Sequence, residues 1–300
     1  MKFDVIGFGA LNVDRLYRVD KIAVSGEERF IKGYNEASGG SAANAIVGLS
    51  RLRNKVGFIG KIGSDREGKL LLKSFLTENV DSRGVIISKN DRSGSVIGFV
   101  DDAGERTLYV DPGANDTFCL EEIDKDYVTS AKFLHITSFV GKKPFEAQNR
   151  ILQSLPDIVV SFDPGELYAR KGLTTLRPIL RRSFVVFPNE HELRLLTGKG
   201  YEEGSKALLK EGVNIVTVKL RERGCYITDG KEELLIEAMK VKIVDTTGAG
   251  DAFCSGFLHG LLLGKDLYTC GKIANFVAGC KIKKTGARAG LPRLNDLPKI

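Results

Sequence analysis

A glycine-rich string that ends in an aspartate is the strongest chemical signal in the sequence. It spans Asp245–Asp251 (DTTGAGD) and opens a segment of small and apolar residues that is typical of a buried helix. The N–H groups at a helix start attract anions, and glycines let a phosphate approach the backbone closely. A carboxylate there would repel a phosphate, so we expect Asp251 to take a proton from a hydroxyl beside a phosphoryl group in transfer. The alternative is that Asp251 only caps the helix.

A second glycine pair precedes another helix of small residues, in Ser38–Ala45 (SGGSAANA). Backbone N–H groups at Gly39 and Gly40, together with the side chain of Asn44, could hydrogen-bond sugar hydroxyls. The alternative is a turn that starts a helix and packs closely through small residues.

A third string, Gly7–Asp14 (GFGALNVD), partly matches a dinucleotide-binding fingerprint. We reject that function because Asn12 replaces the third glycine and no helical pattern follows. Asn12 and Asp14 at the end of a strand suit hydroxyl binding better. The alternative is an Asx turn.

Short apolar runs alternate along the chain with segments whose apolar residues recur at helical spacing. The runs predict buried strands at Phe3–Gly7, Val56–Gly60, Phe133–Ile136, Ile158–Phe162, Phe184–Phe187, Ile215–Val218 and Val241–Val244. The periodic segments predict helices at Ala42–Leu52, Arg66–Thr77 (capped by Asp65), Glu146–Ser154, Glu190–Leu196, Gly204–Glu211, Ala252–Leu263 and Leu267–Lys281. This alternation predicts a three-layer α/β/α body whose mainly parallel sheet is covered by helices on both faces.

Two segments, Arg15–Tyr34 and Gly94–Asp111, break this rhythm because they alternate apolar and polar residues without a helix between. The turn signal at 102–105 divides the second segment into two strands. We expect a small antiparallel sheet, formed by residues of about 12–37 and 91–112, that projects from a single domain of residues 1–300 as a lid. The alternative is a surface excursion without motion.

Composition excludes several classes of protein. The 300 residues include five cysteines without a CxxC pair and three histidines without zinc spacing, so we expect reduced thiols in a cytoplasmic protein. No apolar run is long enough to span a membrane. The net charge of +7 is spread among acidic residues without a basic block, which favours a solvated surface over nucleic-acid binding. Attraction of anionic small molecules is a further reading.

These strings resemble the signatures of the ribokinase, or PfkB, family of carbohydrate and nucleoside kinases over essentially the whole chain. Asp245–Asp251 resembles the C-terminal signature, and Gly39–Ala45 with Val56–Asp65 resembles the N-terminal one. The resemblance implies a ribokinase-like fold and transfer of the γ-phosphate of ATP, with Mg²⁺, to a hydroxyl of a small sugar or nucleoside. It also implies a homodimer formed through the lid.

The resemblance assigns a role to each matching position. The general base is Asp251, and the anion hole is Gly248, Ala249 and Gly250. The acceptor-binding positions are Asn12, Asp14, Gly39, Gly40, Asn44 and, in the second lid hairpin, Arg106. The nucleotide-binding positions are Asn189, Lys219, Gly224, Gly248, Gly250 and Asn275. Asn189 and Glu192 match an NxxE motif of the magnesium network, and Asp245 and Thr247, with Gly286–Ala287, match a monovalent-cation (K⁺) site of some members.

The acceptor stays open at this point. Ser41 stands where ribokinases usually have lysine, which favours a nucleoside or a ribose substituted at C1 over free ribose, and Asp163–Glu166 departs from the stretch expected of a keto-deoxy-gluconate kinase. A hexose, a hexose phosphate and ribose-1-phosphate are alternatives, and a catalytically silent sugar or nucleotide sensor is the rival outside enzymes. Four lid aromatics are candidates either for stacking on a base or for a lid core or dimer contact: Phe30, Tyr34, Phe99 and Tyr109.

Overall fold

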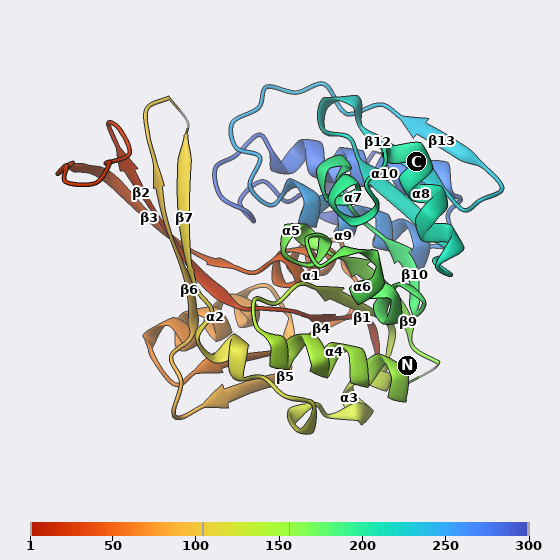
Figure 1. The fold of residues 1–300 in the computed structure, drawn as a ribbon, viewed down its shortest axis with the longest axis horizontal. Coiled ribbons are helices and arrows are strands. Elements are labelled where there is room, and N and C mark those ends of the chain that lie inside the picture. The colour runs from red at the N-terminus through yellow and green to blue at the C-terminus, as the bar shows by residue number, and fades with distance from the viewer. Residues whose placement is uncertain (1, 104, 156, 299–300) are drawn as a thin grey trace.

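The computed structural model describes residues 2–103, 105–155 and 157–298, and a large twisted sheet runs through its centre (Figure 1). Within these residues the sheet has nine strands in the order β13-β12-β11-β10-β9-β8-β1-β4-β5. Neighbouring strands are parallel from β11 to β5, whereas β12 and β13 pair in the antiparallel sense. The strands are β1 (Phe3–Phe8), β4 (Val56–Gly63), β5 (Asp81–Ser88), β8 (Ala131–Thr137), β9 (Val159–Asp163), β10 (Ser183–Val186), β11 (Ile215–Lys219), β12 (Cys225–Thr228) and β13 (Glu233–Ile236).

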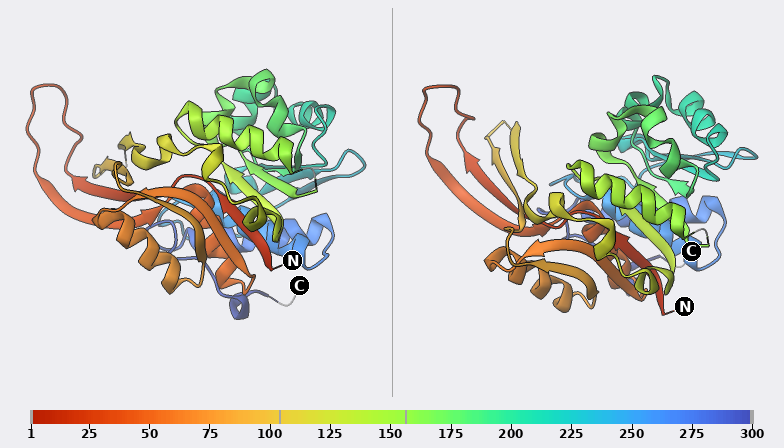
Figure 2. Two further views of the ribbon diagram at one scale, coloured as in Figure 1. Left: turned by 90° about the horizontal axis from the view of Figure 1, so that it is seen from below. Right: turned by 60° about the horizontal axis from the view of Figure 1, so that its bottom comes forward.

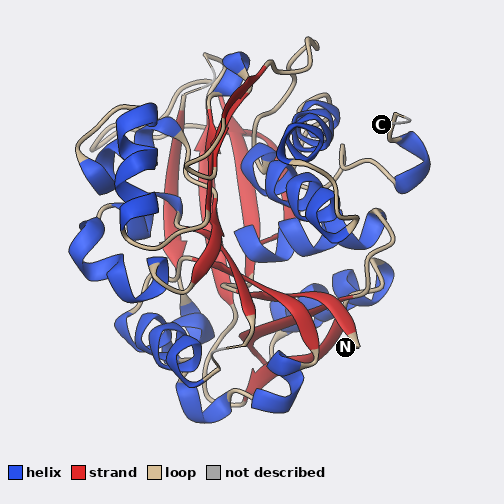
Figure 3. Ribbon diagram, turned by 90° about the vertical axis from the view of Figure 1, so that its right-hand side faces the viewer, coloured by secondary structure: helices blue, strands red, loops and turns tan. Residues whose placement is uncertain are grey.

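Helices cover both faces of the sheet, so the predicted three-layer body is confirmed (Figure 3). One apolar core holds α1 (Ser41–Arg51), α2 (Arg66–Thr77), α9 (Ala249–Leu262) and α10 (Leu267–Lys281) against one face. A second core holds the helices of the other face: α3 (Lys125–Thr129), α4 (Lys142–Ser154), α5 (Gly165–Ala169), α6 (Gly172–Leu180), α7 (Glu190–Thr197) and α8 (Tyr201–Lys210).

Helix α9 is rich in small residues because α10 packs directly against it. A Cβ atom on Gly256 would come within 2.8 Å of Cα of Ala274, and one on Gly260 within 2.8 Å of Sγ of Cys270. Larger side chains at these two glycines would push the helices apart. This close contact fixes α9 against α10, and the end of the DTTGAGD string forms the first turn of α9.

A smaller sheet projects from the body and has the order β3-β2-β6-β7 (Figure 2). Its strands are β2 (Asn12–Val19), β3 (Ile31–Gly39), β6 (Gly94–Val100) and β7 (Arg106–Asp111), close to the predicted lid segments. The expectation of a purely antiparallel sheet was wrong, because β2 and β6 pair in parallel. Asn12 pairs with Gly94 at the base, so both strands run outward from the body side by side.

The strand register places the lid aromatics on the face opposite to Asp14. Tyr17 pairs with Tyr34 and with Phe99, at ring distances of 5.1 and 5.6 Å. Side chains alternate along a strand, so Asp14, three positions before Tyr17, projects from the other face. Tyr109 shares the face of Tyr17 through its pairing with β6. The register therefore favours the lid-core or dimer-contact reading of Tyr34, Phe99 and Tyr109 over base stacking.

The strand predicted at Val241–Val244 is absent among the described residues. This segment pairs with no strand, and Ile243 and Val244 are more than half exposed. The N–H groups of Val244 and Asp245 instead donate to the carbonyl of Ile282. A short apolar run had the composition of a strand but lacked a neighbouring edge with which to pair.

Two further expectations can be compared with the structure. All five cysteines are free, as expected. In the part of the chain that is described, no helix has the length and apolar character needed to cross a membrane.

Candidate active site

The DTTGAGD string forms the turn that begins α9. Gly248 is the N-cap residue, with a left-handed φ of 75°, and a Cβ atom there would come within 2.9 Å of Ala287. Glycine is therefore required both by the backbone conformation and by the close contact with the C-terminal loop. The first N–H groups of a helix lack partners within the helix, so the turn suits an approaching anion.

The carboxyl group of Asp251 lies in the first turn of α9 and is hydrogen-bonded at both oxygens. Ser41 donates its Oγ–H to Oδ1 at 2.5 Å, and Asn44 donates from Nδ2 to Oδ2 at 2.9 Å. Burial raises the pKa of Asp251 to about 6, although these two hydrogen bonds lower it. A carboxylate with such a pKa is ionised at neutral pH and can accept a proton from a bound hydroxyl.

Arg288 holds Asn44 from the other side, a contact that sequence reasoning missed. Its Nε donates to Oδ1 of Asn44 at 2.7 Å, and its terminal nitrogens donate to Oγ of Ser74 at 2.9 Å and to the carbonyl of Gly39 at 3.4 Å. One guanidinium therefore links α1, α2 and the end of β3. Its position next to Gly286–Ala287 was the only signal in the sequence, and an arginine in a polar loop is usually solvated.

Asp14 and the glycine pair come together at the base of the lid. A Cβ atom on Gly39 would come within 2.3 Å of Oδ2 of Asp14, and one on Gly40, whose φ is 103°, would clash with the carbonyl of Ala10. Burial raises the pKa of Asp14 to about 6, with the nearby Arg288 lowering it. Within the described residues no donor bonds to this carboxylate, so it is available to hydroxyl groups of a ligand.

Asn12 has a partner of its own. Its Oδ1 accepts from Nδ2 of Asn115 at 3.1 Å, and Asn115 also bonds to both the N–H and the carbonyl of Leu11. Asn115 therefore ties the start of β2 to the exit of the second lid hairpin. Arg106 begins β7 at the far end of this hairpin, and its side chain lies outside the described part of the structure.

The turn formed by the DTTGAGD string is called the anion turn below. A buried ion pair lies behind it, at the carboxyl ends of two strands. Nζ of Lys219, which ends β11, lies 2.7 Å from Oδ2 of Asp163, which ends β9. Burial alone would lower the pKa of Lys219, but Asp163 and other acidic neighbours outweigh it and raise the pKa. A Cβ atom on Gly250 would come within 3.2 Å of Nζ. The positive charge therefore lies against the backbone of the anion turn.

A pocket of about 320 Å³ opens beside Lys219, between the start of α7 and the turn after β11. In this turn Arg221 is left-handed at φ 56°, and Gly224, at φ 90°, would place a Cβ atom 1.9 Å from the carbonyl of Ile236. The lining is rich in charge: Asn189, Glu190, His191, Arg194, Lys219, Leu220, Arg221, Glu222 and Arg223. Its cations suit a phosphorylated ligand.

Asn189 and Glu192 form a reciprocal cap at the start of α7. Oδ1 of Asn189 accepts from the N–H of Glu192, and Oε2 of Glu192 accepts from the N–H of Asn189, both at 2.8 Å. Burial raises the pKa of Glu192 to about 7, while Lys219 lowers it. The NxxE spacing thus has a structural role in the helix. It also leaves Oε1 of Glu192 without a hydrogen bond among the described residues, and this oxygen fits a water bound to a metal.

The predicted monovalent-cation residues bind one another and a lysine. Oδ1 of Asp245 accepts from the N–H of Thr247 at 2.8 Å, and Oδ2 accepts from the N–H of Gly286 at 2.7 Å. The carbonyl of Asp245 accepts from Nζ of Lys281 at 2.7 Å. Each of these oxygens already faces a donor, and the ammonium of Lys281 would repel a second cation at the same carbonyl, so the residues are a poor fit for a K⁺ site.

Asn275 lies in α10 and contacts the outer strand. Its Nδ2 donates to the carbonyls of Ile236 and Glu237, each at 3.0 Å. These bonds anchor the end of β13 on α10, so a structural role accompanies the predicted position beside the nucleotide.

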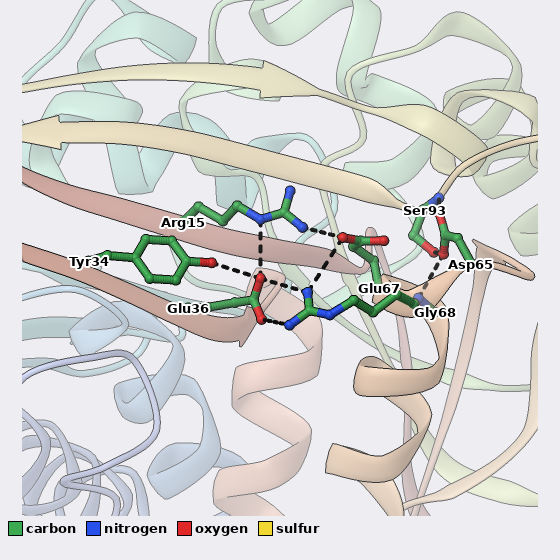
Figure 4. A network of polar contacts seen from close by, with 8 residues as sticks. Arg15, Tyr34, Glu36, Asp65, Glu67, Gly68 and Ser93 are labelled. Atoms are coloured by element: carbon green, nitrogen blue, oxygen red, sulfur yellow. Dashed lines mark hydrogen bonds and ion pairs between the residues drawn. The ribbon is translucent and has the colours of Figure 1, made fainter. Parts of the chain in front are cut away.

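Ion pairs join the lid to the body (Figure 4). Glu36 of β3 accepts hydrogen bonds from Tyr34, Arg15 and Arg66, and Arg15 also pairs with Glu67 at the start of α2. The hydrogen bonds from Arg66, Tyr34 and Arg15 lower the pKa of Glu36 to about 2. These contacts fix the base of the lid over the start of α2, on the lid face opposite to Asp14.

The same helix start is capped by a side chain that also holds the second lid segment. Asp65 accepts from the N–H of Gly68 at 2.8 Å, as its predicted capping role requires, and from the N–H and Oγ of Ser93 at 2.7 and 2.6 Å. Both inserts that form the lid are therefore anchored at one helix end.

Comparison with known proteins is consistent across nearly the whole chain. An uncharacterized sugar kinase of Archaeoglobus fulgidus is 44% identical over 83% of this chain and 100% of its own length. An ATP-dependent ribose-1-phosphate kinase of Halopiger xanaduensis is 31% identical over 95% of this chain and 94% of its own. The crystal structure of a ribokinase from Thermotoga maritima superposes with a TM-score of 0.89 at 25% identity, covering 98% and 97% of the two chains.

Residues 2–294 match the family described as pfkB family carbohydrate kinase. The nine-stranded and four-stranded sheets of the described residues are the ribokinase-like fold predicted from sequence. The chain therefore belongs to the pfkB family of carbohydrate kinases, which are phosphotransferases with hydroxyl acceptors, and is a sugar or nucleoside kinase.

Proposed function

We propose that this chain, acting as a single kinase domain, transfers the γ-phosphate of ATP to a hydroxyl of a ribose-type acceptor, with Asp251 as the general base. The observation that carries the proposal is the carboxyl group of Asp251. It lies beside the backbone of Gly248 and Gly250 and is oriented by Ser41 and Asn44, and burial raises its pKa to about 6. A helix cap alone would need neither the two side-chain donors nor the adjacent anion turn.

In this mechanism the acceptor lies between Asp14 and Asp251, below the lid. Its hydroxyl oxygen attacks the γ-phosphorus, and the hydroxyl proton passes to Asp251. The bond from the γ-phosphorus to the bridging oxygen breaks, and ADP leaves. The backbone of Gly248–Gly250 and the ammonium of Lys219 stabilise charge on the transferring group, as phosphoryl transfer requires. The donor's phosphates occupy the pocket beside Lys219 and Arg221.

Magnesium is part of the proposal. Mg²⁺ on the donor would neutralise charge on the β- and γ-phosphates. Asn189 and Glu192 would hold it through water, since the described residues contain no cluster of three or more His, Cys, Asp or Glu able to ligate a metal directly.

The preference for a nucleoside or a C1-substituted ribose rests on Ser41. Because Ser41 is short and donates to Asp251, it leaves space where a lysine would stand. The lid face above Asp14 is aliphatic, since a Cβ atom on Gly98 would touch both Leu16 and Leu108. This surface would cover the base or substituent.

A second acceptor class is ribose-1-phosphate. A relative named as an ATP-dependent ribose-1-phosphate kinase is 31% identical, and the guanidinium of Arg288 lies near Asp14, where its charge partly offsets the rise in the pKa of Asp14 that burial causes. A cation at the acceptor site would favour a phosphorylated sugar.

The test is ADP release, measured with adenosine, inosine, guanosine, cytidine, ribose-1-phosphate, ribose, fructose and fructose-6-phosphate under identical conditions. We expect a nucleoside or ribose-1-phosphate to give the highest kcat/KM. A tenfold lead for fructose or fructose-6-phosphate, about 1.4 kcal/mol in transition-state stabilisation, would replace the ribose-type acceptor by a hexose. Nucleotide binding without turnover of any acceptor would favour a sensor.

We also propose that the chain acts in the cytoplasm as a homodimer. A second copy would bind the lid face that carries Tyr17, Tyr34 and Tyr109. Phe30, Tyr34 and Tyr109 are 88%, 53% and 63% exposed, and they belong to the lid rather than to the body. Tyr34 and Tyr109 share one face of the lid sheet, and exposed aromatic side chains on one face are typical of an interface. Light scattering should report a dimer, and Tyr109→Glu should give a monomer with intact helical content.

A further inference from the structure

Lys281, the last residue of α10, carries a fully buried ammonium group. Its Nζ donates to the backbone carbonyl of Asp245 at 2.7 Å and to that of Lys284 at 3.3 Å. Burying a charge is unfavourable unless polar groups surround it. A lysine retained in such a place therefore points to a use for its charge.

The ammonium joins the two chain segments that shape the anion turn. The N–H groups of Val244 and Asp245 donate to the carbonyl of Ile282, and Oδ2 of Asp245 accepts from the N–H of Gly286. Gly248 then packs on Ala287 of the same C-terminal loop. A change in the contact between these segments would move the turn on which a phosphate would bind.

An alkali-metal ion in this place would have to share its oxygen ligands with the donors already there and would be repelled by the ammonium of Lys281. The two carboxyl oxygens of Asp245 accept from N–H groups, and its carbonyl accepts from Lys281. The oxygens that would surround an ion therefore already face donors. An ammonium group is a monovalent cation that hydrogen-bonds carbonyls, so it can supply the same charge at the same carbonyls.

We propose that the ammonium of Lys281 takes the place of the monovalent cation that the family resemblance associates with Asp245, so that turnover does not depend on K⁺. This inference rests on the proposed kinase function. It makes Lys281 a positioning residue, because it acts through Asp245 and the loop under Gly248 and touches neither substrate.

The first experiment uses the unchanged protein. ADP release is measured in buffers whose only monovalent cation is K⁺, Na⁺ or tetramethylammonium. We expect rates that agree within about twofold, because the charge is part of the chain. Activation by K⁺ of about fivefold or more over tetramethylammonium would overturn the proposal.

The second experiment removes the charge with Lys281→Met. In tetramethylammonium we expect kcat to fall about tenfold or more, since a preorganised charge near the transferring group is lost. Added K⁺ or NH₄⁺ should restore part of the rate by entering the vacated space. Lys283→Met is the matched control, because Lys283 is exposed in the same loop and should show neither the loss nor the rescue. A loss that neither cation relieves would show a packing role only.

Thermal unfolding provides a readout that does not need turnover. K⁺ or NH₄⁺ should raise the Tm of Lys281→Met relative to tetramethylammonium and leave that of the wild type unchanged. If the wild type turned over no acceptor, the proposed function would fail, and this comparison would still decide the role of Lys281. Equal cation effects on both proteins would contradict it. If the variant does not fold, the wild-type comparison decides alone.

Discussion

The side-chain amide of Asn44 donates a hydrogen bond to Oδ2 of Asp251 at 2.9 Å, across 207 positions of sequence. Its other end accepts from Nε of Arg288 at 2.7 Å. A guanidinium can only donate and a carboxylate can only accept, so the amide has one orientation that satisfies both. Arg288 thereby fixes the direction in which Asn44 points at Asp251.

We expect Asn44→Ala and Arg288→Met each to lower kcat by about tenfold, because Asp251 loses its orientation, with little change in the KM for ATP. If Arg288 acts through Asn44, the double variant should lose little more than either single variant. Steady-state kinetics on the four proteins give the coupling.

The matched control for Arg288 is Arg51→Met. Arg51 donates to the carbonyls of Arg288 and Leu291 and pairs with Glu78, so it supports the same loop without touching Asn44. Arg51→Met should lower Tm, and its effect on kcat should be independent of the effect of Asn44→Ala. If the loss in kcat of the double variant equalled the product of the two single losses, Arg288 would not act through Asn44.

The acid limb of activity should reflect Asp251. Because burial raises its pKa to about 6, the base becomes protonated, and kcat falls, as pH decreases through about 6. The same raised pKa has the opposite effect on stability as pH falls. A carboxyl group whose folded pKa exceeds its unfolded value destabilises the ionised protein, so this contribution improves as pH falls from about 6 towards 4. Asp251→Asn should abolish turnover yet raise Tm at pH 8, measured by calorimetry. An active Asp251→Asn enzyme would exclude Asp251 as the base.

Asp14 should affect binding of the acceptor rather than binding of ATP. Its carboxylate has no donor among the described residues and lies against Gly39, so it is placed to accept bonds from ligand hydroxyls. Asp14→Ala should raise the acceptor KM by about tenfold or more, the value of a charge-assisted hydrogen bond, and leave the ATP KM within about twofold. Equal changes in both constants would place Asp14 outside the acceptor site.

The parts of the fold that sequence predicted are those set by local pattern. Asp65 caps α2 as expected because capping involves residues three apart, and Arg66–Thr77 has the predicted bounds. The strands at the two sides of the sheet, β5, β12 and β13, were missed, and Val241–Val244 was assigned wrongly, because pairing depends on neighbours that one segment does not reveal.

For the candidate site, the sequence predicted single residues but not the contacts between them. Motifs indicated Asp251 and Asn44 individually, but their hydrogen bond depends on helix packing between α1 and α9. Alternation showed that the lid strands have two faces, and only the register revealed that Asp14 and Tyr34 lie on opposite ones. Arg288 and Lys281 were not predicted, because burial of an arginine or lysine follows from tertiary contacts that composition does not report.

The last prediction concerns the donor pocket and uses two arginines with the same backbone strain. Arg221 and Arg53 are left-handed, at φ 56° and 64°, a conformation that is unfavourable by roughly 1–2 kcal/mol for residues other than glycine. Arg221 lines the pocket beside Lys219, whereas Arg53 is exposed after α1. Neither guanidinium has a hydrogen bond or ion pair among the described residues.

Glycine at either position relieves the backbone but adds freedom to the unfolded chain, so Arg221→Gly and Arg53→Gly should change stability alike, within about 1 kcal/mol. Only Arg221→Gly should weaken ATP binding, by about tenfold, because it removes a charged donor to the phosphates. Calorimetric titration with ATP, ADP and adenosine separates the contributions, since adenosine has no phosphate and should bind both variants like the wild type. If ATP bound Arg221→Gly as tightly as Arg53→Gly, the phosphates would lie away from this turn. A matching loss for adenosine would instead place Arg221 at the nucleoside end of the pocket.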